Sequence, residues 1–481
     1  MSKKASIIIF GVLGAVIIAL GVLLAATTAS NSRTILGLGA INDDLEYQKS
    51  ILASQKDSLE AQVADLQKKL DNAGELYADE IDTLKLEIED KLEQIAALEA
   101  DIAKYQTVFT IDVRAQAQLI EQIEEYISTQ CPFVKLKAST KGTSEDDSAE
   151  EYTWVRVADL IAEEKNRRAA LGDEAEPLYT DEELSKSGKT AAELTELKLR
   201  EIVFSREDVV YPSVSVYYED LATGYHYGYN EDARYESASV IKAPYIFSIL
   251  REIAAQEKAY LDAKTAAGEA PELADTDGDG VPDTILYEYS DPIYNLSDTI
   301  IYERQTMLQS GSGEIKNLPD GTELSYIDLI KYTLEYSDNI GFAQLKKRFG
   351  YNRYYTLLRD VKANNTLNNA KYMTAAGTGK LFKAMWEFID EDETYGKLMY
   401  DSMLKANHTV IIPYGVSPTK ALHKYGWDVD SYHDAAIVLH PDKPYVLTVF
   451  TDLDNGGNEV NAYLQNIVKM INKLHKGYYQ S

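Results

Sequence analysis

The sequence predicts an α+β domain whose antiparallel sheet is built from both ends of the domain, preceded by a transmembrane helix and an α-helical coiled coil. Three observations support this. Residues 6–26 are uncharged and almost wholly apolar, and apolar residues recur at heptad spacing through residues 41–130. From residue 205 onward, strand-like stretches occupy both ends and helical patterns lie between them. That order indicates one sheet flanked by helices.

Residues 1–30 have the pattern of a membrane anchor. As a helix the apolar run would span about 31 Å, enough for the hydrocarbon core of a bilayer. Lys3 and Lys4 precede it, which predicts a cytoplasmic N-terminus and export of the rest. A cleaved signal peptide is the alternative, but the run exceeds the roughly 7–15 residues of a typical signal core. We therefore expect a single-pass cell-membrane protein with an extracytoplasmic C-terminal domain.

Residues 31–130 predict a coiled-coil stalk. Between residues 41 and 130 there is no Pro and a single Gly, Gly74. Two heptad frames run through this segment, offset by four residues, which is a stutter. The first is Leu45, Leu52, Leu59, Val63, Leu66, Leu70, Ala73 and Tyr77, and the second is Ile81, Leu84, Ile88, Ile95, Leu98, Ile102, Tyr105 and Phe109. One continuous helix would reach about 130 Å. A single polar-faced helix is the alternative.

A coiled coil implies a homo-oligomer, and an anchor on every copy would set the copies parallel. Cys131 is the only cysteine, so no intramolecular disulfide can form. At the end of a parallel stalk it would lie beside its symmetry mate, where a disulfide is geometrically possible. The net charge of −30 argues against nucleic acid as a partner, because phosphate binding needs a basic face.

Residues 131–204 predict a linker and a short helical neck. Residues 139–151 are polar and rich in turn-forming residues, which is typical of a linker. Two amphipathic helical stretches follow, near residues 154–171 and 181–199. No chemistry is assigned to this region.

Residues 205–479 predict the globular domain. Its first part reads as a β-hairpin over residues 213–229, followed by a helix to about residue 256. Further helices are expected at residues 340–349, 354–361, 375–389 and 460–474, and strands at residues 423–427, 434–439 and 445–452.

An insertion at residues 262–300 contains a candidate calcium loop. Oxygen ligands at loop positions 1, 3, 5, 7 and 9, with a glycine at position 6, match an EF-hand-like pattern. The ligands would be Asp275, Asp277, Asp279, the Val281 carbonyl and Asp283. Position 12 is Leu286 instead of Glu, and Glu288 could replace the missing ligand. A plain acidic turn is the alternative to a structural Ca²⁺ site; no cofactor is expected for catalysis.

Ser239 and Lys242 form a Ser-x-x-Lys motif at the start of a predicted helix. Three residues make almost one helical turn, so both side chains share a face. A lysine amine can take the proton of a serine hydroxyl if desolvation lowers its pKa. The chain contains two further matches, Ser402/Lys405 and Ser417/Lys420, and any single match can be a helix-surface pair.

The order of motifs distinguishes Ser239 from the other two serines. Ser337-Asp338-Asn339 follows it, and then Lys424-Tyr425-Gly426. Ser-x-x-Lys, Ser-Asp-Asn and Lys-Thr-Gly together characterise class A β-lactamases and penicillin-binding proteins. Residues 205–478 therefore resemble the class A β-lactamase and penicillin-recognising active-serine hydrolase family.

The resemblance implies a β-lactamase/D,D-peptidase fold and a role for each matching residue. Ser239 would be the acylated nucleophile and Lys242 its base or proton relay. Ser337 would pass a proton to the leaving nitrogen, and Lys424 would present positive charge to the cleft and to a substrate carboxylate. The substrate would also contact Asn339, Tyr425, Gly426 and Trp427, with the backbone N–H groups of Ser239 and Trp427 forming an oxyanion hole.

Two departures from the family pattern bear on activity. Tyr425 stands where the family usually has a threonine beside the substrate carboxylate. The family's water-activating glutamate also has no counterpart, because residues 336–386 contain no Glu. Asn364–Asn368 occupies roughly the place of that loop, and Asp360, His433 or Lys242 would have to activate the water instead.

We expect an extracytoplasmic serine hydrolase that forms an acyl-serine with β-lactams or with peptidoglycan peptides resembling D-Ala-D-Ala, and deacylates slowly. The alternative is a non-turnover binding or scaffold protein of the cell envelope that keeps the fold. A third hypothesis is that the protein serves only as a structural spacer. The fate of a labelled penicillin on the protein would discriminate among them.

Overall fold

The computed structural model describes residues 50–65, 68, 88–97, 113–137, 152–269, 273–274, 284–285, 295–363, 371–441, 443–454 and 457–477. The chain divides into two compact units, residues 1–122 with 473–481, and residues 123–472. The predicted anchor at residues 1–30 lies outside the described residues. Among the helices that are described, none combines the length and apolar character needed to cross a bilayer.

The first unit corrects the prediction of one continuous stalk helix. Residues 50–65 and 88–97 are helical, and Leu52, Leu59 and Ile95 are buried in one cluster. A straight helix would separate Leu52 from Ile95 by about 65 Å. The two segments therefore pack on each other within one chain, and their heptad positions are buried there instead of along a single rod.

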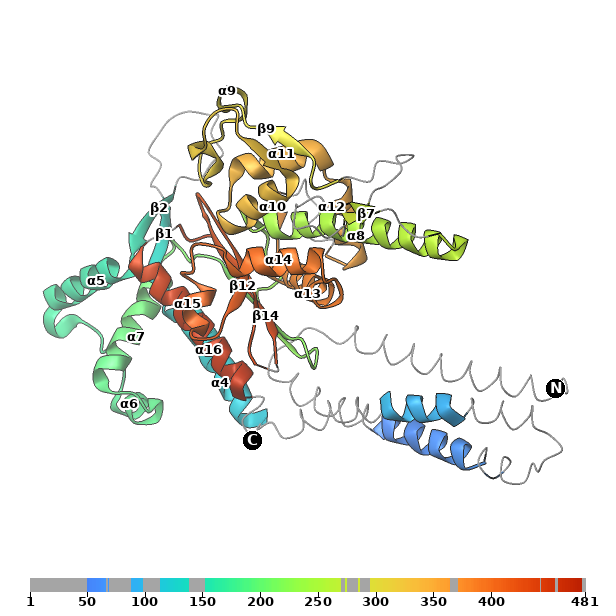
Figure 1. The fold of residues 1–481 in the computed structure, drawn as a ribbon. Coiled ribbons are helices and arrows are strands. Elements are labelled where there is room, and N and C mark those ends of the chain that lie inside the picture. The colour runs from blue at the N-terminus through green and yellow to red at the C-terminus, as the bar shows by residue number, and fades with distance from the viewer. Residues whose placement is uncertain are drawn as a thin grey trace, which may run out of the picture. The chain divides into compact units, whose positions relative to one another are not determined.

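The second unit is organised around a five-stranded antiparallel sheet of order β12-β13-β14-β4-β5 (Figure 1). Its strands are β4 (Val214–Asp220), β5 (His226–Tyr229), β12 (Ala421–Asp428), β13 (Ser431–Val438) and β14 (Tyr445–Thr451). In the register, β14 bridges the two halves through Val449↔Val216 and Asp434↔Val449. The prediction of a sheet assembled from both ends of the domain is confirmed.

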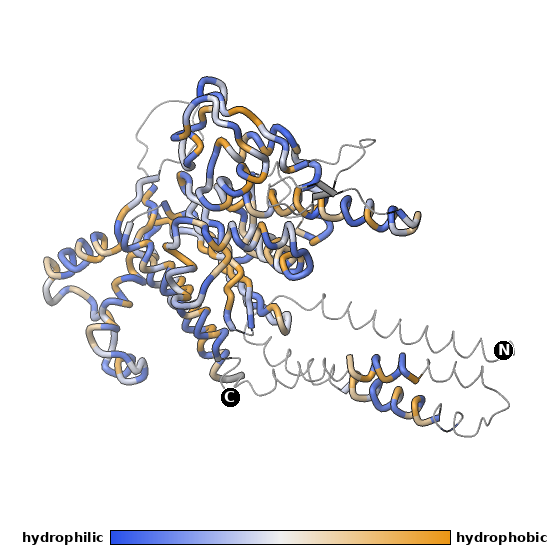
Figure 2. Tube along the Cα trace, in the orientation of Figure 1, coloured by the Kyte–Doolittle hydropathy of each residue, from blue (hydrophilic) through white to orange (hydrophobic). Residues whose placement is uncertain are grey.

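Helices cover both faces of this sheet, since every residue of β13 and β14 is buried. Figure 2 shows the hydropathy along the chain. On β14 the Thr448 hydroxyl donates to Ala375 at the start of α13 (Ala375–Glu391), whereas Tyr445 donates to Asn472 of α16 (Asn458–Gly477). Tyr445 and Thr448 are three positions apart on the strand, so their side chains point to opposite faces and these helices lie on opposite faces.

The remaining helices of the domain form a helical part beside the sheet. They are α8 (Lys242–Ala267), α9 (Arg304–Met307), α10 (Tyr326–Glu335), α11 (Asn339–Phe349), α12 (Asn352–Asp360), α14 (Tyr395–Leu404) and α15 (Ile412–Val416). Short strands connect them: β6 (Tyr235–Glu236), β9 (Thr299–Ile301), β10 (Glu323–Ser325) and β11 (Tyr372–Met373). The 3₁₀ turn η3 (Ile315–Asn317) completes this side. The largest core cluster joins α8, α10, α11 and α13 to the sheet.

Residues 131–137 and 152–211 form a folded module that contains strands as well as the predicted helices, and the predicted linker at residues 139–151 lies outside the described residues. β1 (Phe133–Lys137) pairs with β2 (Tyr152–Arg156) and β3 (Val209–Val210). The helices are α5 (Val157–Leu171), the 3₁₀ turn η2 (Gly172–Glu174), α6 (Asp181–Ser187) and α7 (Ala191–Phe204). Val134, Leu160 and Leu199 belong to a core of its own. The alternation in β1 is only five residues long, too short a signal against the neighbouring helical patterns.

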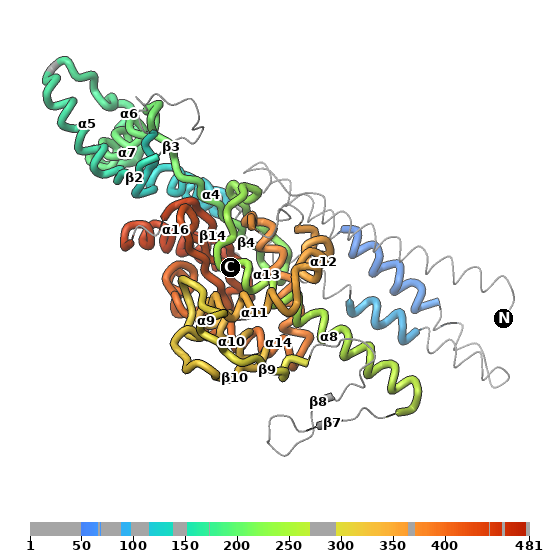
Figure 3. The backbone as a smooth tube through the Cα atoms, turned by 90° about the horizontal axis from the view of Figure 1, so that it is seen from above, coloured from blue at the N-terminus to red at the C-terminus, as the bar shows by residue number. Residues whose placement is uncertain are grey.

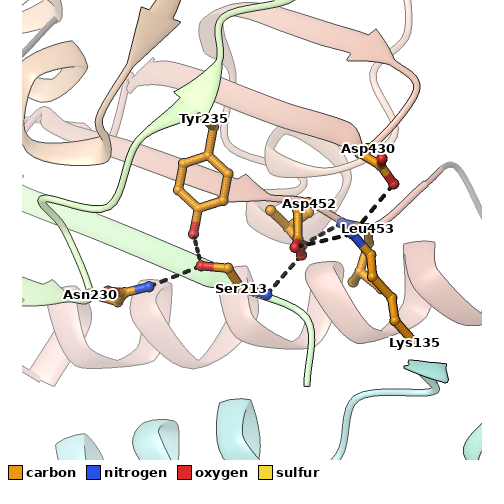
Figure 4. A network of polar contacts seen from close by, with 8 residues as sticks. Lys135, Ser213, Asn230, Tyr235, Asp430, Asp452 and Leu453 are labelled. Carbon is orange, nitrogen blue, oxygen red and sulfur yellow. Dashed lines mark hydrogen bonds and ion pairs between the residues drawn. The ribbon is translucent and has the colours of Figure 1, made fainter. Parts of the chain in front are cut away.

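This module is attached to the five-stranded sheet by polar contacts (Figure 4). Lys135 Nζ lies 3.4 Å from a carboxylate oxygen of both Asp430 and Asp452, and 4.7 Å from the centre of the Trp154 ring. Asp452 also accepts the Ser213 backbone N–H at 2.7 Å. The helix that precedes this module, α4 (Val113–Thr129), packs on α16, where the Tyr126 ring stacks on the Tyr463 ring with 5.6 Å between centres. The two helices run side by side in Figures 1 and 3.

Cys131 does not lie where the disulfide hypothesis requires it. Its side chain has no exposed surface, and its thiol donates to the Phe133 carbonyl at 3.3 Å. Burial raises the pKa of the thiol to about 12, so a reactive thiolate is disfavoured. A bond between Cys131 and its counterpart in another copy is therefore incompatible with this packing.

The calcium-loop residues 275–283 lie outside the described residues. The segments that flank them pair as β7 (Leu273–Ala274) and β8 (Thr284–Ile285), with Leu273 opposite Ile285. In the part of the chain that is described, no group of three or more acidic, His or Cys residues could hold a metal ion.

Candidate active site

Ser239 lies in the tight turn between β6 and α8. The turn is closed by hydrogen bonds from Val240 N to Ser237 O at 3.1 Å and from Lys242 N to Ser239 O at 3.2 Å. Ala238, immediately before the serine, has a φ of 42°, which is unfavourable for a residue with a Cβ. The serine is partly exposed at the N-terminal end of a helix that is otherwise buried over its first turns. The position is one where the helix dipole favours an oxyanion.

The edge strand β12 runs directly against this turn. A Cβ on Gly426 would come within 2.9 Å of the backbone nitrogens of Ser239 and Val240, and within 3.1 Å of Ala238 Cβ. Only a glycine lets the strand approach so closely. β12 is the first strand in the sheet order, so it is an edge strand.

We expect Gly426→Ala to slow acylation of Ser239 by at least about tenfold, because the added methyl must displace the serine turn or the strand and so misplace an oxyanion donor. Adduct formation measured by intact mass would test this. The melting temperature would show whether the variant still folds, as β12 keeps its ladder with β13. Acylation at the wild-type rate would contradict the close approach.

Lys242 is buried and lies almost one helical turn after Ser239. Its side chain is 2% exposed. The amine contacts Ser337 O at 2.6 Å, Asn339 Oδ1 at 2.7 Å and Ser337 Oγ at 3.2 Å. Burial lowers the pKa of Lys242 to about 7, with Asp338 opposing and Lys346 adding to this shift. A large fraction of Lys242 is therefore neutral near pH 7 and able to accept a proton.

Ser337 connects the two lysines of the site. Its hydroxyl receives a hydrogen bond from Lys424 Nζ at 2.9 Å and lies 3.2 Å from Lys242 Nζ. The residue is buried and has a φ of 55°, a strained conformation that aims the side chain between the two amines. Such a bridging hydroxyl can pass a proton from one side to the other.

Asp338 and Asn339 hold the turn that carries Ser337. Asp338 caps α11 by accepting Gly341 N at 2.9 Å and also accepts Ile315 N at 2.8 Å. Asn339 Nδ2 donates to Ser310 O at 2.7 Å, so its amide is engaged by the loop 310–313 as well as by Lys242. The expected role of Asn339 in binding a substrate amide therefore competes with this loop contact.

Lys424 is almost fully buried. It is 1% exposed and donates to Tyr425 O at 3.0 Å in addition to Ser337 Oγ. Burial and the neighbouring Lys242 hold the pKa of Lys424 well below its usual range, while Asp434 raises it. The amine is therefore largely shielded from solvent, and the expected contact between Lys424 and a substrate carboxylate stays a prediction.

The two remaining strand residues differ in exposure. Tyr425 is almost fully buried, and its ring lies 4.3 Å from the His408 ring, centre to centre. Trp427 is exposed, with Nε1 3.4 Å from an Asp454 carboxylate oxygen. Trp427 is two residues from Tyr425 on a strand, so Gly426 separates a buried aromatic ring from an exposed one.

Of the three residues proposed to activate the water, His433 and Asp360 do not fit that role, and Lys242 remains. His433 is buried, its Nε2 lies 2.8 Å from Glu236 O, and its Nδ1 accepts Thr451 N at 3.2 Å. Both ring nitrogens are thus occupied, and burial lowers the pKa of His433 to about 4. Asp360 pairs with Arg251 at 2.9 Å on the surface. Asn364–Asn368 lies outside the described residues.

A described contact brings Lys371 near the serine turn. Ser237 N donates to Lys371 O at 2.7 Å, and β11 pairs with β6 through Tyr372 and Glu236. Lys371 therefore contacts Ser237, which lies two residues before Ser239 in the sequence. The other Ser-x-x-Lys serines lie elsewhere in the fold: Ser402 is buried in α14, and Ser417 precedes a cis Pro418.

Comparison with known protein families identifies the family of this chain. A family model described as the Beta-lactamase enzyme family matches residues 198–283 and 284–474, more than half of the chain. The chain belongs to this family. No curated protein matches it.

Several solved structures are similar to this member of the Beta-lactamase enzyme family. A β-lactamase from Sphaerobacter thermophilus shares 18% identity, over 55% of this chain and 92% of that chain, with a TM-score of 0.43. PBP-A shares 14% over 57% and 92%, with a TM-score of 0.43. A class A β-lactamase from Mycobacterium abscessus shares 17% over 54% and 92%, with a TM-score of 0.39.

Sequence reasoning missed three contributors to the site of this β-lactamase-family member. Asp338 provides the nearest favourable charge for Lys242, the loop 310–313 covers the Asn339 turn, and His408 packs on Tyr425. Asp338 belongs to the Ser-Asp-Asn motif, and its position just before a predicted helix could have identified it as an N-cap residue. The other two come from distant segments and leave no local pattern.

Proposed function

We propose that the protein is an extracytoplasmic serine hydrolase that forms an acyl-Ser239 intermediate, with β-lactams or D-Ala-D-Ala-like peptides as the substrate class. The observation that carries this proposal is the Ser337 hydroxyl between Lys242 and Lys424, beside the turn that holds Ser239. Lys242 would take the Ser239 proton during attack, and Ser337 would return a proton to the leaving group. Anchoring through residues 1–30 and self-association through residues 31–130 belong to the same proposal.

The test is a time course of intact mass after the full chain is mixed with a labelled penicillin, with a fluorophosphonate in a parallel sample. A single adduct on Ser239 supports the proposal. If neither reagent forms an adduct, the alternative of a non-turnover binding protein is favoured. Two observations make that alternative worth testing: protein groups already engage Lys242, Lys424 and Asn339, and residues 336–386 contain no Glu.

We expect acylation to accelerate as the pH rises through about 7. The folded-state pKa of Lys242 is lowered to about 7, so the neutral, proton-accepting amine is present above that pH and lost below it. Initial acylation rates at a series of pH values would give the profile. Lys242→Ala should slow acylation about 10²–10⁴-fold and abolish this dependence. A wild-type profile that is flat across neutral pH would rule out Lys242 as the base.

We also propose that residues 275–283 bind a structural Ca²⁺ outside the active site. The acidic side chains supply oxygen ligands, and the pairing of β7 with β8 brings the two ends of the segment together. Calcium should raise the melting temperature by mass action, and Asp277→Asn with Asp279→Asn should remove that effect. A melting temperature that responds neither to millimolar Ca²⁺ nor to a chelator would exclude the site.

A further inference from the structure

We propose that Lys135 is a positioning residue for acylation of Ser239: it fixes the turn between β12 and β13 to the end of β14, and so holds the strand that is expected to supply an oxyanion donor. This proposal rests on the proposed acylation of Ser239 and adds to it a residue from the module that precedes the catalytic motifs. The contacts of Lys135 and of its two carboxylate partners, drawn in Figure 4, support it.

Lys135 is held at the centre of the module's own sheet. It is the middle residue of β1 and lies opposite Trp154 of β2 and Val210 of β3. Its amine is 4.7 Å from the centre of the Trp154 ring, which is a favourable partner for a cation. Because the side chain is only 14% exposed, the amine is directed to one place and loses less freedom in an ion pair than a surface lysine would.

Asp452, one of the two partners of Lys135, is anchored in the domain. Its carboxylate accepts the Ser213 backbone N–H at 2.7 Å, and its own backbone N–H donates to Ser213 O at 3.2 Å. The Ser213 hydroxyl lies 2.6 Å from the Tyr235 hydroxyl and accepts from Asn230 Nδ2 at 3.1 Å. Tyr235 belongs to β6, which leads into the Ser239 turn. Asp452 is therefore a fixed point that is connected to the segment of the nucleophile.

Asp430, the other partner, lies in the hairpin turn that ends β12. The turn consists of Val429 and Asp430, between the paired residues Asp428 and Ser431. Val429 is 79% exposed and the Asp430 side chain 54% exposed, so burial contributes little to holding this turn. Asp430 also has a φ of 54°, a conformation that costs energy for a residue with a Cβ. The ion pair between Lys135 and Asp430 at 3.4 Å connects this exposed turn to the module.

Lys135 lies between two carboxylates that repel each other. Burial raises the pKa of Asp452, Lys135 lowers it, and the charge of Asp430 raises it. The ammonium is 3.4 Å from an oxygen of each carboxylate, so it draws the turn toward the end of β14. Without it, the charges of Asp430 and Asp452 would face each other and push the turn away.

The place of this turn determines how β12 lies against the nucleophile. Trp427, whose backbone N–H is the expected oxyanion donor, is followed by Asp428, the last residue of β12. Gly426 packs so closely on the Ser239 turn that a Cβ would come within 2.9 Å of its backbone. An oxyanion donor works only at about 2.7–3.1 Å from the oxyanion, so a small shift of the strand weakens it. The shift should slow bond formation and spare substrate binding, because the oxyanion exists only after attack.

The experiment measures acylation of the full chain by a labelled penicillin at several concentrations, with intact mass as the readout. It gives the limiting acylation rate and the concentration at half of that rate. We expect Lys135→Met to lower the limiting rate about tenfold and to leave the half-saturating concentration within about twofold, because one donor is misplaced and not removed. Lys135→Arg keeps the charge and should restore the rate to within about threefold of the wild type.

Arg156→Met is the matched control, because Arg156 joins the same module to Glu459 of α16 and not to the β12–β13 turn. It should be acylated at the wild-type rate. Asp430→Asn removes the proposed ion pair from the other side and keeps a residue type that tolerates a positive φ. It should slow acylation to a similar extent as Lys135→Met. The double variant should be no slower than Lys135→Met alone, whereas two independent defects would multiply.

A wild-type limiting rate in Lys135→Met or in Asp430→Asn would overturn this inference and leave the proposed function intact. An equal loss of rate in Arg156→Met would overturn it too, since any weakening of the module's attachment would then be sufficient. If the wild type forms no adduct with the penicillin or with a fluorophosphonate, the proposed function fails and the inference with it. Melting temperatures show that folded proteins are compared, and the exposed Asp430 variant keeps the test decisive if Lys135→Met is unstable.

Discussion

Ser239→Ala should abolish covalent labelling by a β-lactam or a fluorophosphonate while the domain stays folded. The serine is partly exposed in a turn, and removal of one hydroxyl there leaves the backbone hydrogen bonds of that turn in place. The hydroxyl oxygen is the atom that would bond to the acyl group, so no residual adduct is expected. Intact mass after overnight incubation measures the outcome directly.

Ser402→Ala and Ser417→Ala are the matched controls, because each lies in one of the other two Ser-x-x-Lys sequences. Both should label like the wild type, although Ser402 is buried and its substitution should be checked by the melting temperature. Equal labelling of the wild type and Ser239→Ala would refute the assignment of the nucleophile. Loss of labelling in either control would move the assignment to that serine.

The acyl-enzyme formed with a penicillin should be long-lived. Deacylation needs a water that is activated and aimed at the ester carbonyl, and loss of a general base typically slows such a step about 10²–10⁴-fold. Residues 336–386 contain no Glu, both nitrogens of His433 are occupied, and Asp360 pairs with Arg251. Lys242 is then the remaining candidate. Decay of the adduct after removal of free drug gives the lifetime, and a half-life of seconds or less would contradict slow deacylation.

A variant that introduces a new carboxylate tests the same deacylation step by an expected gain in rate. The backbone contact between Lys371 and Ser237 brings the chain after residue 370 next to the serine turn. A carboxylate introduced shortly before it, as in Asn364→Glu, should shorten the adduct lifetime if residues 364–368 reach Ser239. Asp360→Asn serves as a control and should leave the lifetime unchanged, because its partner is Arg251 on the surface. An unchanged lifetime in Asn364→Glu would place that segment elsewhere.

Motif order predicted that Ser239, Ser337 and Lys424 lie near one another. Ser239, Ser337 and Lys424 are far apart in sequence, yet the structure brings Ser337 and Lys424 into contact and places Gly426 against the Ser239 turn. The prediction of a sheet from both ends of the domain rested on alternation of apolar residues, which is a local property. Burial on both faces of β13 and β14 then requires the helical layers that the structure has.

Packing between distant segments was not predictable in this way. Heptad spacing made Leu52 and Ile95 apolar, but it did not reveal that they bury each other within one chain. The three-stranded module at residues 131–211 depends on β3, which joins β1 from more than 70 residues away. Pairing of that kind is a long-range interaction, and a five-residue alternation carries little information about it.

The sequence by itself determined the residue types of the site, their order, and the absence of a glutamate between residues 336 and 386. Only the tertiary structure decided the chemical state of those residues. Lys242 and Lys424 are both lysines in family motifs, but the protonation of each depends on burial and on charges that other elements bring close, Asp338 for one and Asp434 for the other. The Tyr425 ring covers Lys424 because His408, on a separate loop, packs behind it. Desolvation and Coulomb interaction depend on distances in space, which the order of residues along the chain does not specify.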